Sequence, residues 1–128
     1  MSALECRGLC RRLLVVGCLL LALITYAGSP QAQEARKFTL INVLFDGTKV
    51  WLPSSVMVHE GDTVELTLLN KLDEPHGFQI AAFGIEEVVQ PKAQTSVQFT
   101  ATKAGLYSFI CHIHPPHIGG QILVLKKE

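Results

Sequence analysis

The feature of this sequence that most constrains its fold is a series of short segments in which polar and apolar residues alternate. The clearest covers residues 63–70, Thr-Val-Glu-Leu-Thr-Leu-Leu-Asn, and similar stretches occur at 37–43, 95–100 and 106–111. A period of two buries one face of a β-strand and exposes the other. Gly, Pro, Asn and Asp separate the segments, and no stretch beyond residue 38 keeps a helical period. The sequence therefore predicts an all-β domain.

The number of such segments indicates the architecture. Shorter candidates at 54–58, 77–80, 86–89 and 121–125 bring the total to seven or eight strands. Many short strands divided by turns are typical of an antiparallel β-sandwich or barrel with a single core. A chain of this length is also large enough for such a core to fold independently.

The first 32 residues differ in composition from the rest. Residues 13–26 form an uncharged apolar run, with three arginines before it and small or polar residues after it. This layout is typical of a secretory signal peptide, and the run is shorter than the ~20 residues that span a bilayer. We expect an export signal at 1–32 and a periplasmic or secreted domain at 33–128. The alternative is an uncleaved anchor, the only case in which we expect contact with a membrane.

Charge excludes one class of partner. The 11 Lys and Arg residues balance the 11 Asp and Glu residues, so the formal net charge is zero. Because nucleic-acid binding needs a basic face that neutralises phosphates, we expect no nucleic-acid partner.

Of the four cysteines, only Cys111 lies beyond the leader, so the expected mature domain cannot form an internal disulfide. A lone thiol in an oxidising compartment is exposed to oxidation or wrong pairing, and binding a metal as a thiolate protects it. The other reading is a buried, inert core cysteine. The neighbouring residues decide between the two.

All five histidines follow the leader, and four fall in two clusters where a predicted strand meets a loop. One cluster contains His76, and the other runs from Cys111 through His112 and His114 to His117. A Cys-x-x-His spacing is weak evidence alone, but three histidines and this cysteine within seven positions indicate a metal site. A thiolate with imidazoles suits copper, zinc or iron, and two histidines with one cysteine favour copper in electron transfer.

Three other residues are candidates that the motifs do not settle. His112 alternates out of phase with its neighbours, so we expect it to point away from the site. His59 precedes a Glu-Gly-Asp turn and is expected on the surface. Glu74, two residues before His76, is either solvated or a supporting residue or ligand.

Together these motifs resemble those of the cupredoxins, the small blue-copper proteins. The resemblance covers about Phe38 to Leu125 and rests on Gly61-Asp62-Thr63-Val64, Glu74-x-His76-Gly77-Phe78, Gly105-x-Tyr107-x-Phe109-x-Cys111-x-x-His114 and Gly120-x-Ile122-x-Val124. It implies an eight-stranded Greek-key sandwich with one copper ion near the surface at one end. It also implies His76, Cys111 and His114 as equatorial ligands.

The sequence departs from this pattern at the axial position. Many cupredoxins place a methionine two residues before the glycine that opens the last strand, but here that position is Ile118, and Met57 lies far upstream. We expect the adjacent His117 to serve as the fourth ligand. The ligand types would then resemble those of the red copper protein nitrosocyanin, although its ligand spacing is not reproduced. The alternative is an empty axial position, with His117 at the surface.

These features predict an exported electron carrier rather than an enzyme, with redox proteins of the periplasm as partners. Weak redox encounters use small interfaces, which suits a neutral domain. One alternative is chemistry on nitric oxide or peroxide at an open copper position. Another is copper handling, which is less favoured because the chain lacks methionine-rich or histidine-rich tracts.

Overall fold

The computed structural model describes residues 33–114 and 117–128. The predicted leader at 1–32 lies outside these residues, so export remains a prediction. Within the described part, no helix is long and apolar enough to cross a membrane. The strands are β1 (Arg36–Phe45), β2 (Thr48–Leu52), β3 (Ser55–His59), β4 (Thr63–Asn70), β5 (His76–Ile80), β6 (Ile85–Val89), β7 (Gln94–Thr100), β8 (Gly105–Phe109) and β9 (Gly120–Leu125), with a 3-10 turn η1 (Ala81–Phe83).

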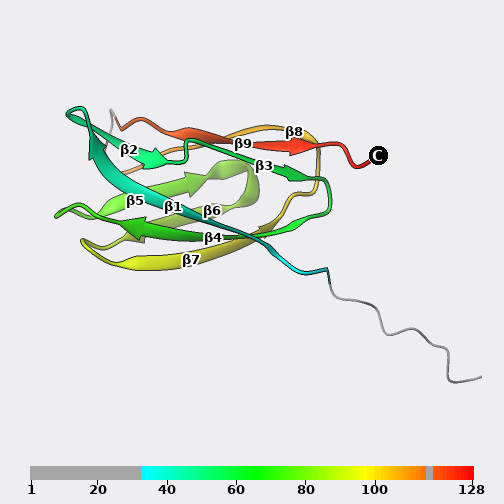
Figure 1. The fold of residues 1–128 in the computed structure, drawn as a ribbon, viewed down its shortest axis with the longest axis horizontal. Helices are drawn as coiled ribbons and strands as arrows, with labels where there is room; N and C mark the ends of the chain where they lie inside the picture. Colours follow the sequence, from blue (N-terminus) through cyan, green and yellow to red (C-terminus); the bar gives the residue numbers. More distant parts are fainter. Residues whose placement is uncertain (1–32, 115–116) are drawn as a thin grey trace, which may run out of the picture. The chain divides into compact units, whose positions relative to one another are not determined.

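The strands form three hydrogen-bonded groups, which lie against one another in Figure 1, and their buried apolar residues form one core. The first is a four-stranded sheet in the order β2-β1-β4-β7, the second has the order β3-β9-β8, and β5 and β6 form a ribbon. Main-chain hydrogen bonds between Gln79 and Ile110, at 2.9 and 3.0 Å, link this ribbon to the end of β8. The all-β prediction is confirmed.

Two details differ from the sequence-based expectation. The described part has nine strands rather than seven or eight, because Asp46 and Gly47 both take positive φ (47° and 75°) and reverse β1 into β2. Such two-residue turns match the twist of a hairpin. The sandwich is also not purely antiparallel, since β1 runs parallel to β4 and β3 runs parallel to β9.

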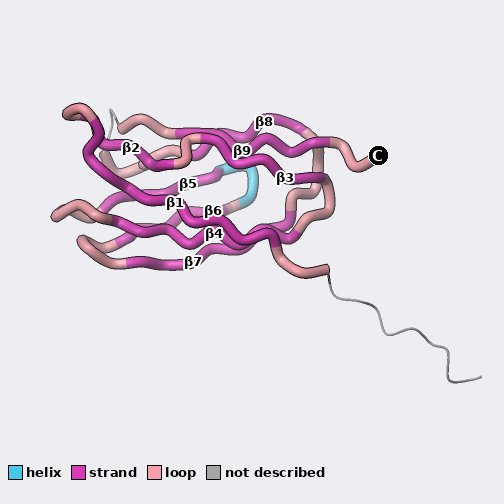
Figure 2. The backbone as a smooth tube through the Cα atoms, in the orientation of Figure 1, coloured by secondary structure: helices cyan, strands magenta, loops and turns pink. Residues whose placement is uncertain are grey.

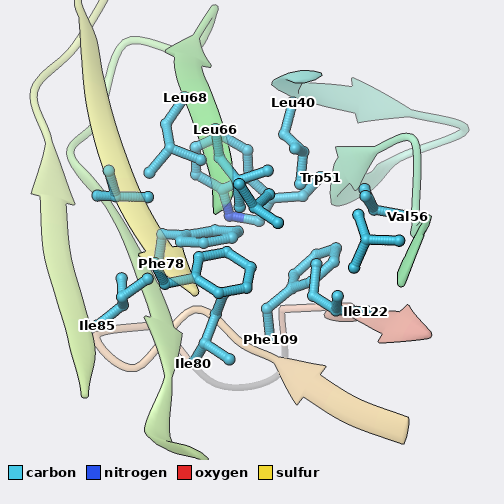
Figure 3. Packing of buried hydrophobic residues seen from close by; sticks show 14 of the residues in the cluster. Leu40, Trp51, Val56, Leu66, Leu68, Phe78, Ile80, Ile85, Phe109 and Ile122 are labelled. Carbon is cyan, nitrogen blue, oxygen red and sulfur yellow. The ribbon is translucent and has the colours of Figure 1, made fainter. Parts of the chain in front are cut away.

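The core lies between the sheets and contains the inward-facing residues of the alternating segments. In β4 the burial pattern alternates along all eight residues, as its sequence predicts. Trp51, Phe78 and Phe109 are the bulkiest fully buried side chains, and Figure 3 shows them among the aliphatic residues of several strands.

Several loops gather at one end of the sandwich, as Figure 2 shows for the β1–β2, β4–β5 and β6–β7 connections. Asn70 ties two of these loops together. Its Nδ2 donates to the carbonyl oxygens of Glu74 (2.7 Å) and Val89 (3.1 Å), and its Oδ1 accepts from the N–H of Leu72 (3.0 Å). The loop that precedes β5 is therefore fixed from inside the fold.

Candidate metal centre

Three side chains from two distant parts of the sequence bring their donor atoms together at this end. His76 opens β5, Cys111 follows β8, and His117 lies in the loop before β9; their ligand atoms are all within 4.8 Å of one another. The Nδ1 of His76 is 3.9 Å from the Sγ of Cys111. With metal–nitrogen and metal–sulfur bonds of about 2.0 to 2.3 Å, two donors on one ion lie roughly 3.5 to 3.8 Å apart. The cluster therefore has nearly the dimensions of a coordination sphere.

His114 lies beside this group but outside the tight three-donor set. The centroid of its ring is 5.0 Å from that of His76, the same distance that separates the rings of His76 and His117. All four residues predicted as ligands thus come together. The closest set contains His117 where the family resemblance implied His114.

Two of the three donor residues are buried, and several ring nitrogens at the site have no hydrogen-bond partner. His76 is 0 % exposed and Cys111 is 5 % exposed. Among the described residues, the Nε2 of His76, the Nδ1 of His114 and both ring nitrogens of His117 are buried without a hydrogen bond. Leaving such an atom unpaired costs about 1–3 kcal/mol. A metal ion accounts for unpaired donors of this kind, and the combination of imidazoles with a thiolate fits copper.

Burial also keeps the imidazoles in the form that binds metal. Desolvation, reinforced by the positive charges of His76, Lys49 and His114, lowers the pKa of His117 to about 4. Desolvation is also the largest cause that lowers the pKa of His76, and the charge of His114 is the next largest. Both rings are consequently neutral at neutral pH, as metal coordination requires.

Of the roles considered for Glu74, the structure matches a solvated carboxylate. Its Oε1 lies 2.7 Å from the Nζ of Lys49, and its side chain is half exposed. The hydrogen bond from Lys49 lowers the pKa of Glu74. The carboxylate therefore offsets the nearby lysine charge at the edge of the site.

The sulfur of Cys111 has a partner that the sequence did not reveal. The backbone N–H of Gly77 donates to Sγ at 3.2 Å, in a buried position. The carbonyl oxygen of Gly77 accepts a hydrogen bond from the Nε1 of Trp51, also at 3.2 Å. These contacts join residues 34 and 26 positions apart, and no local pattern could indicate them.

The remaining sequence candidates lie outside the three-donor set. His112 packs against the backbone of Gly77. His59 is partly exposed beside Asp62, with 4.0 Å between its Nδ1 and the Asp62 Oδ2. Ile118, at the expected axial position, is 55 % exposed, and Met57 is 59 % exposed on β3. No methionine thus replaces the missing axial ligand within the described residues.

A β-sandwich that holds a thiolate and imidazoles at one end is the architecture of the cupredoxin class. The profile of the family described as Cupredoxin-like domain matches residues 17–124. The chain belongs to this family, and the cupredoxin resemblance is confirmed.

The relative and the structural neighbours that this chain matches are longer proteins. A nitrous-oxide reductase from Pseudomonas fluorescens is 32% identical over 101 residues, covering 66% of this chain but only 16% of that protein. The copper nitrite reductase of Nitrosomonas europaea superposes with a TM-score of 0.64 at 24% identity, over 74% of this chain and 43% of that one. A multi-copper oxidase from Pseudomonas thermotolerans gives a TM-score of 0.61 at 19% identity, over 76% and 31%. The chain thus spans less than half the length of each, and the structural matches show the fold.

Proposed function

We propose that this protein is an exported, mononuclear copper protein that transfers electrons through a site formed by His76, Cys111, His114 and His117. The observation that carries the proposal is the largely buried cluster in which the Cys111 sulfur and nitrogens of two imidazoles lie within 4.8 Å of one another. Bound copper would supply a one-electron couple between Cu(I) and Cu(II). The protein's part is to hold the donors so that little rearrangement accompanies the change of charge.

The strands around the cluster support this rigid role. His76 pairs with Val89 in the β5–β6 ribbon. Directly before Cys111, Ile110 pairs with Gln79. His114 and His117 are only partly buried, and this gives electrons a short route to the surface.

Exposed apolar side chains at the same end support brief docking to a redox protein. In the loop between β8 and β9, Ile113 directly precedes His114 and Ile118 directly follows His117, and they are 37 % and 55 % exposed. Leu44 and Phe45, at the end of β1 next to the hairpin turn, are 58 % and 66 % exposed. Exposed apolar groups near a site are typical of interaction surfaces. A periplasmic location and periplasmic redox partners follow from the predicted export signal.

One observation favours a second candidate, small-molecule chemistry at the metal. Since His114 lies outside the tight donor set, a ligand such as nitrite could take its place on copper. The similarity to proteins named nitrous-oxide reductase and copper nitrite reductase is compatible with this role.

The test is the visible and EPR spectrum of the copper-loaded domain, with His59→Ala as the matched control for histidine loss away from the site. We expect a thiolate-to-copper absorption that Cys111→Ser abolishes and His117→Ala shifts, while His59→Ala leaves it unchanged. A reversible redox couple unaffected by azide or nitrite supports electron transfer, and an anion-dependent spectrum supports the second candidate. A colourless protein, or absorption that survives Cys111→Ser, would refute both.

A further inference from the structure

The backbone of Gly77 is held at both of its polar groups by side chains. Two residues later on the same strand, the N–H and C=O of Gln79 pair with the backbone of Ile110. Alternate residues of a strand direct their backbone groups to the same edge. At Gly77 that edge meets the Sγ of Cys111 and the indole of Trp51 instead, each at 3.2 Å. Two side chains thus continue the ladder at the point where it reaches the candidate ligand.

Trp51 is a rigid donor for this purpose. Its side chain is 0 % exposed, and its ring meets that of Phe78 edge-to-face, with centroids 5.5 Å apart and an interplanar angle of 77°. The preceding residue, Val50, forms a backbone bridge with Ile118, directly after His117. Strand β2 therefore contacts both segments that carry the donor atoms.

Gly77 is buried and paired with Val88 of β6, and the Cys111 and Trp51 side chains restrain it further. A Cβ at this position would lie 2.7 Å from the Nδ1 of His112 and 3.0 Å from its backbone nitrogen, so His112 packs directly onto the glycine. Glycine has more backbone freedom than any other residue. The tether on its carbonyl therefore adds to the strand pairing in fixing the orientation of the N–H relative to the sulfur.

We propose that Trp51 is a positioning residue, which holds Gly77 so that its N–H donates to the Cys111 thiolate and thereby raises the reduction potential of bound copper. The inference rests on the proposed electron-transfer function. A hydrogen bond to the thiolate withdraws electron density from sulfur, which favours Cu(I) over Cu(II). When the indole N–H is removed, the Gly77 bond to sulfur weakens and Cu(II) is favoured.

The first test compares Trp51→Phe with Phe109→Leu as the matched control. Both residues are fully buried aromatics that contact Phe78, but only Trp51 donates to Gly77. For Trp51→Phe we expect a shifted thiolate-to-copper band. We also expect the ratio of the affinity for Cu(II) to the affinity for Cu(I) to rise three- to tenfold, in line with partial loss of one hydrogen bond. A tenfold change lowers a one-electron potential by about 59 mV. Equal shifts in both variants, or none in Trp51→Phe, would overturn the proposal.

The second test uses the metal-free protein and does not depend on copper. We expect the amide of Gly77 to exchange its hydrogen at least tenfold faster in Trp51→Phe than in the wild type, and to be unaffected in Phe109→Leu. If Trp51→Phe does not fold, exchange in the wild type decides, because the Trp51 indole and the Gly77 amide must both be strongly protected. A rapidly exchanging Gly77 amide contradicts the proposal. If the wild type shows no thiolate-to-copper band, the proposed function fails separately, while this measurement still tests the tether.

Discussion

Two buried asparagines allow the contribution of hydrogen bonding at the metal end to be measured directly. Asn42 on β1 and Asn70 on β4 are partners in register, and both are 0 % exposed. Asn70 makes hydrogen bonds with the carbonyls of Glu74, Val89 and Gln90 and with the N–H of Leu72, at 2.7 to 3.2 Å. The side-chain amide of Asn42 has no partner among the described residues. Truncating each residue to alanine removes the same atoms but very different contacts.

The expected difference follows from a count of these bonds. A carboxamide has two N–H groups, so Asn70 makes two donor bonds at full strength and one acceptor bond. At about 1 kcal/mol for each bond, Asn70→Ala should cost at least about 3 kcal/mol more than Asn42→Ala in free energy of unfolding, because Asn42→Ala also removes two buried polar atoms that have no partner among the described residues. The packing losses are similar in the two variants and largely cancel.

Urea denaturation of the metal-free variants measures this difference, provided that their m-values agree. Asn70→Ala should also weaken copper binding, because the Glu74 carbonyl that Asn70 holds is only two residues before His76. Equal costs for the two variants would mean that the Asn42 amide has partners of its own, and the count would be refuted.

Three further outcomes are expected. Since the pKa of His117 falls from 6.5 to about 4 in the folded, metal-free protein, the unfolded state binds more protons between these values. Stability should therefore fall as the pH drops from 6.5 to 4, and a His117→Gln variant that keeps the full slope in urea titrations would contradict this. A backbone N–H that donates to Asp62 lowers the pKa of its carboxyl. Asp62→Asn should thus cost about 1–3 kcal/mol at pH 7 and progressively less as the pH falls below 3.8, and a pH-independent cost would argue against it. A Cβ on Gly120 would overlap the ring of Phe109, so Gly120→Ala should lower the free energy of unfolding by about 3 kcal/mol or more. A Cβ on Gly47 meets no atom within 4 Å, so Gly47→Ala should cost only about 1 kcal/mol, for its positive φ. Similar melting temperatures of the two variants would refute this contrast.

Much of the fold could be predicted from alternation alone. The bounds of β4 match the 63–70 segment, because each of its inward residues is apolar or, at Asn70, fully hydrogen-bonded. Strand β2 was missed since adjacent Val50 and Trp51 are both buried and break the alternation. The parallel pairing of β1 with β4 could not be predicted either. Periodicity shows which face of a strand is buried, but not which strand lies beside it.

The candidate site was predictable in composition but not in arrangement. Cys111 and the histidines were recognisable because few other roles place these residue types so close together. Whether His114 or His117 joins the closest donor set depends on the path of the loop between β8 and β9. The spacing from Cys111 to either histidine allows both residues to bind the same ion, so the sequence does not decide between them. The Trp51 contact with Gly77 was beyond sequence reasoning, although Trp51 is the only tryptophan in the chain.

The position of β9 has a consequence for how the protein is made. Among the described strands β9 comes last in the sequence, yet it lies between β3 and β8 and pairs with residues as far back as Ser55. Contacts between such distant segments form late, because the long intervening chain must first be closed into a loop. A chain in which β9 has not yet docked would hold Cys111 and His76 without the strand that brings their supports together. Metal capture at this site should therefore follow the docking of β9 and report on completed folding of the domain.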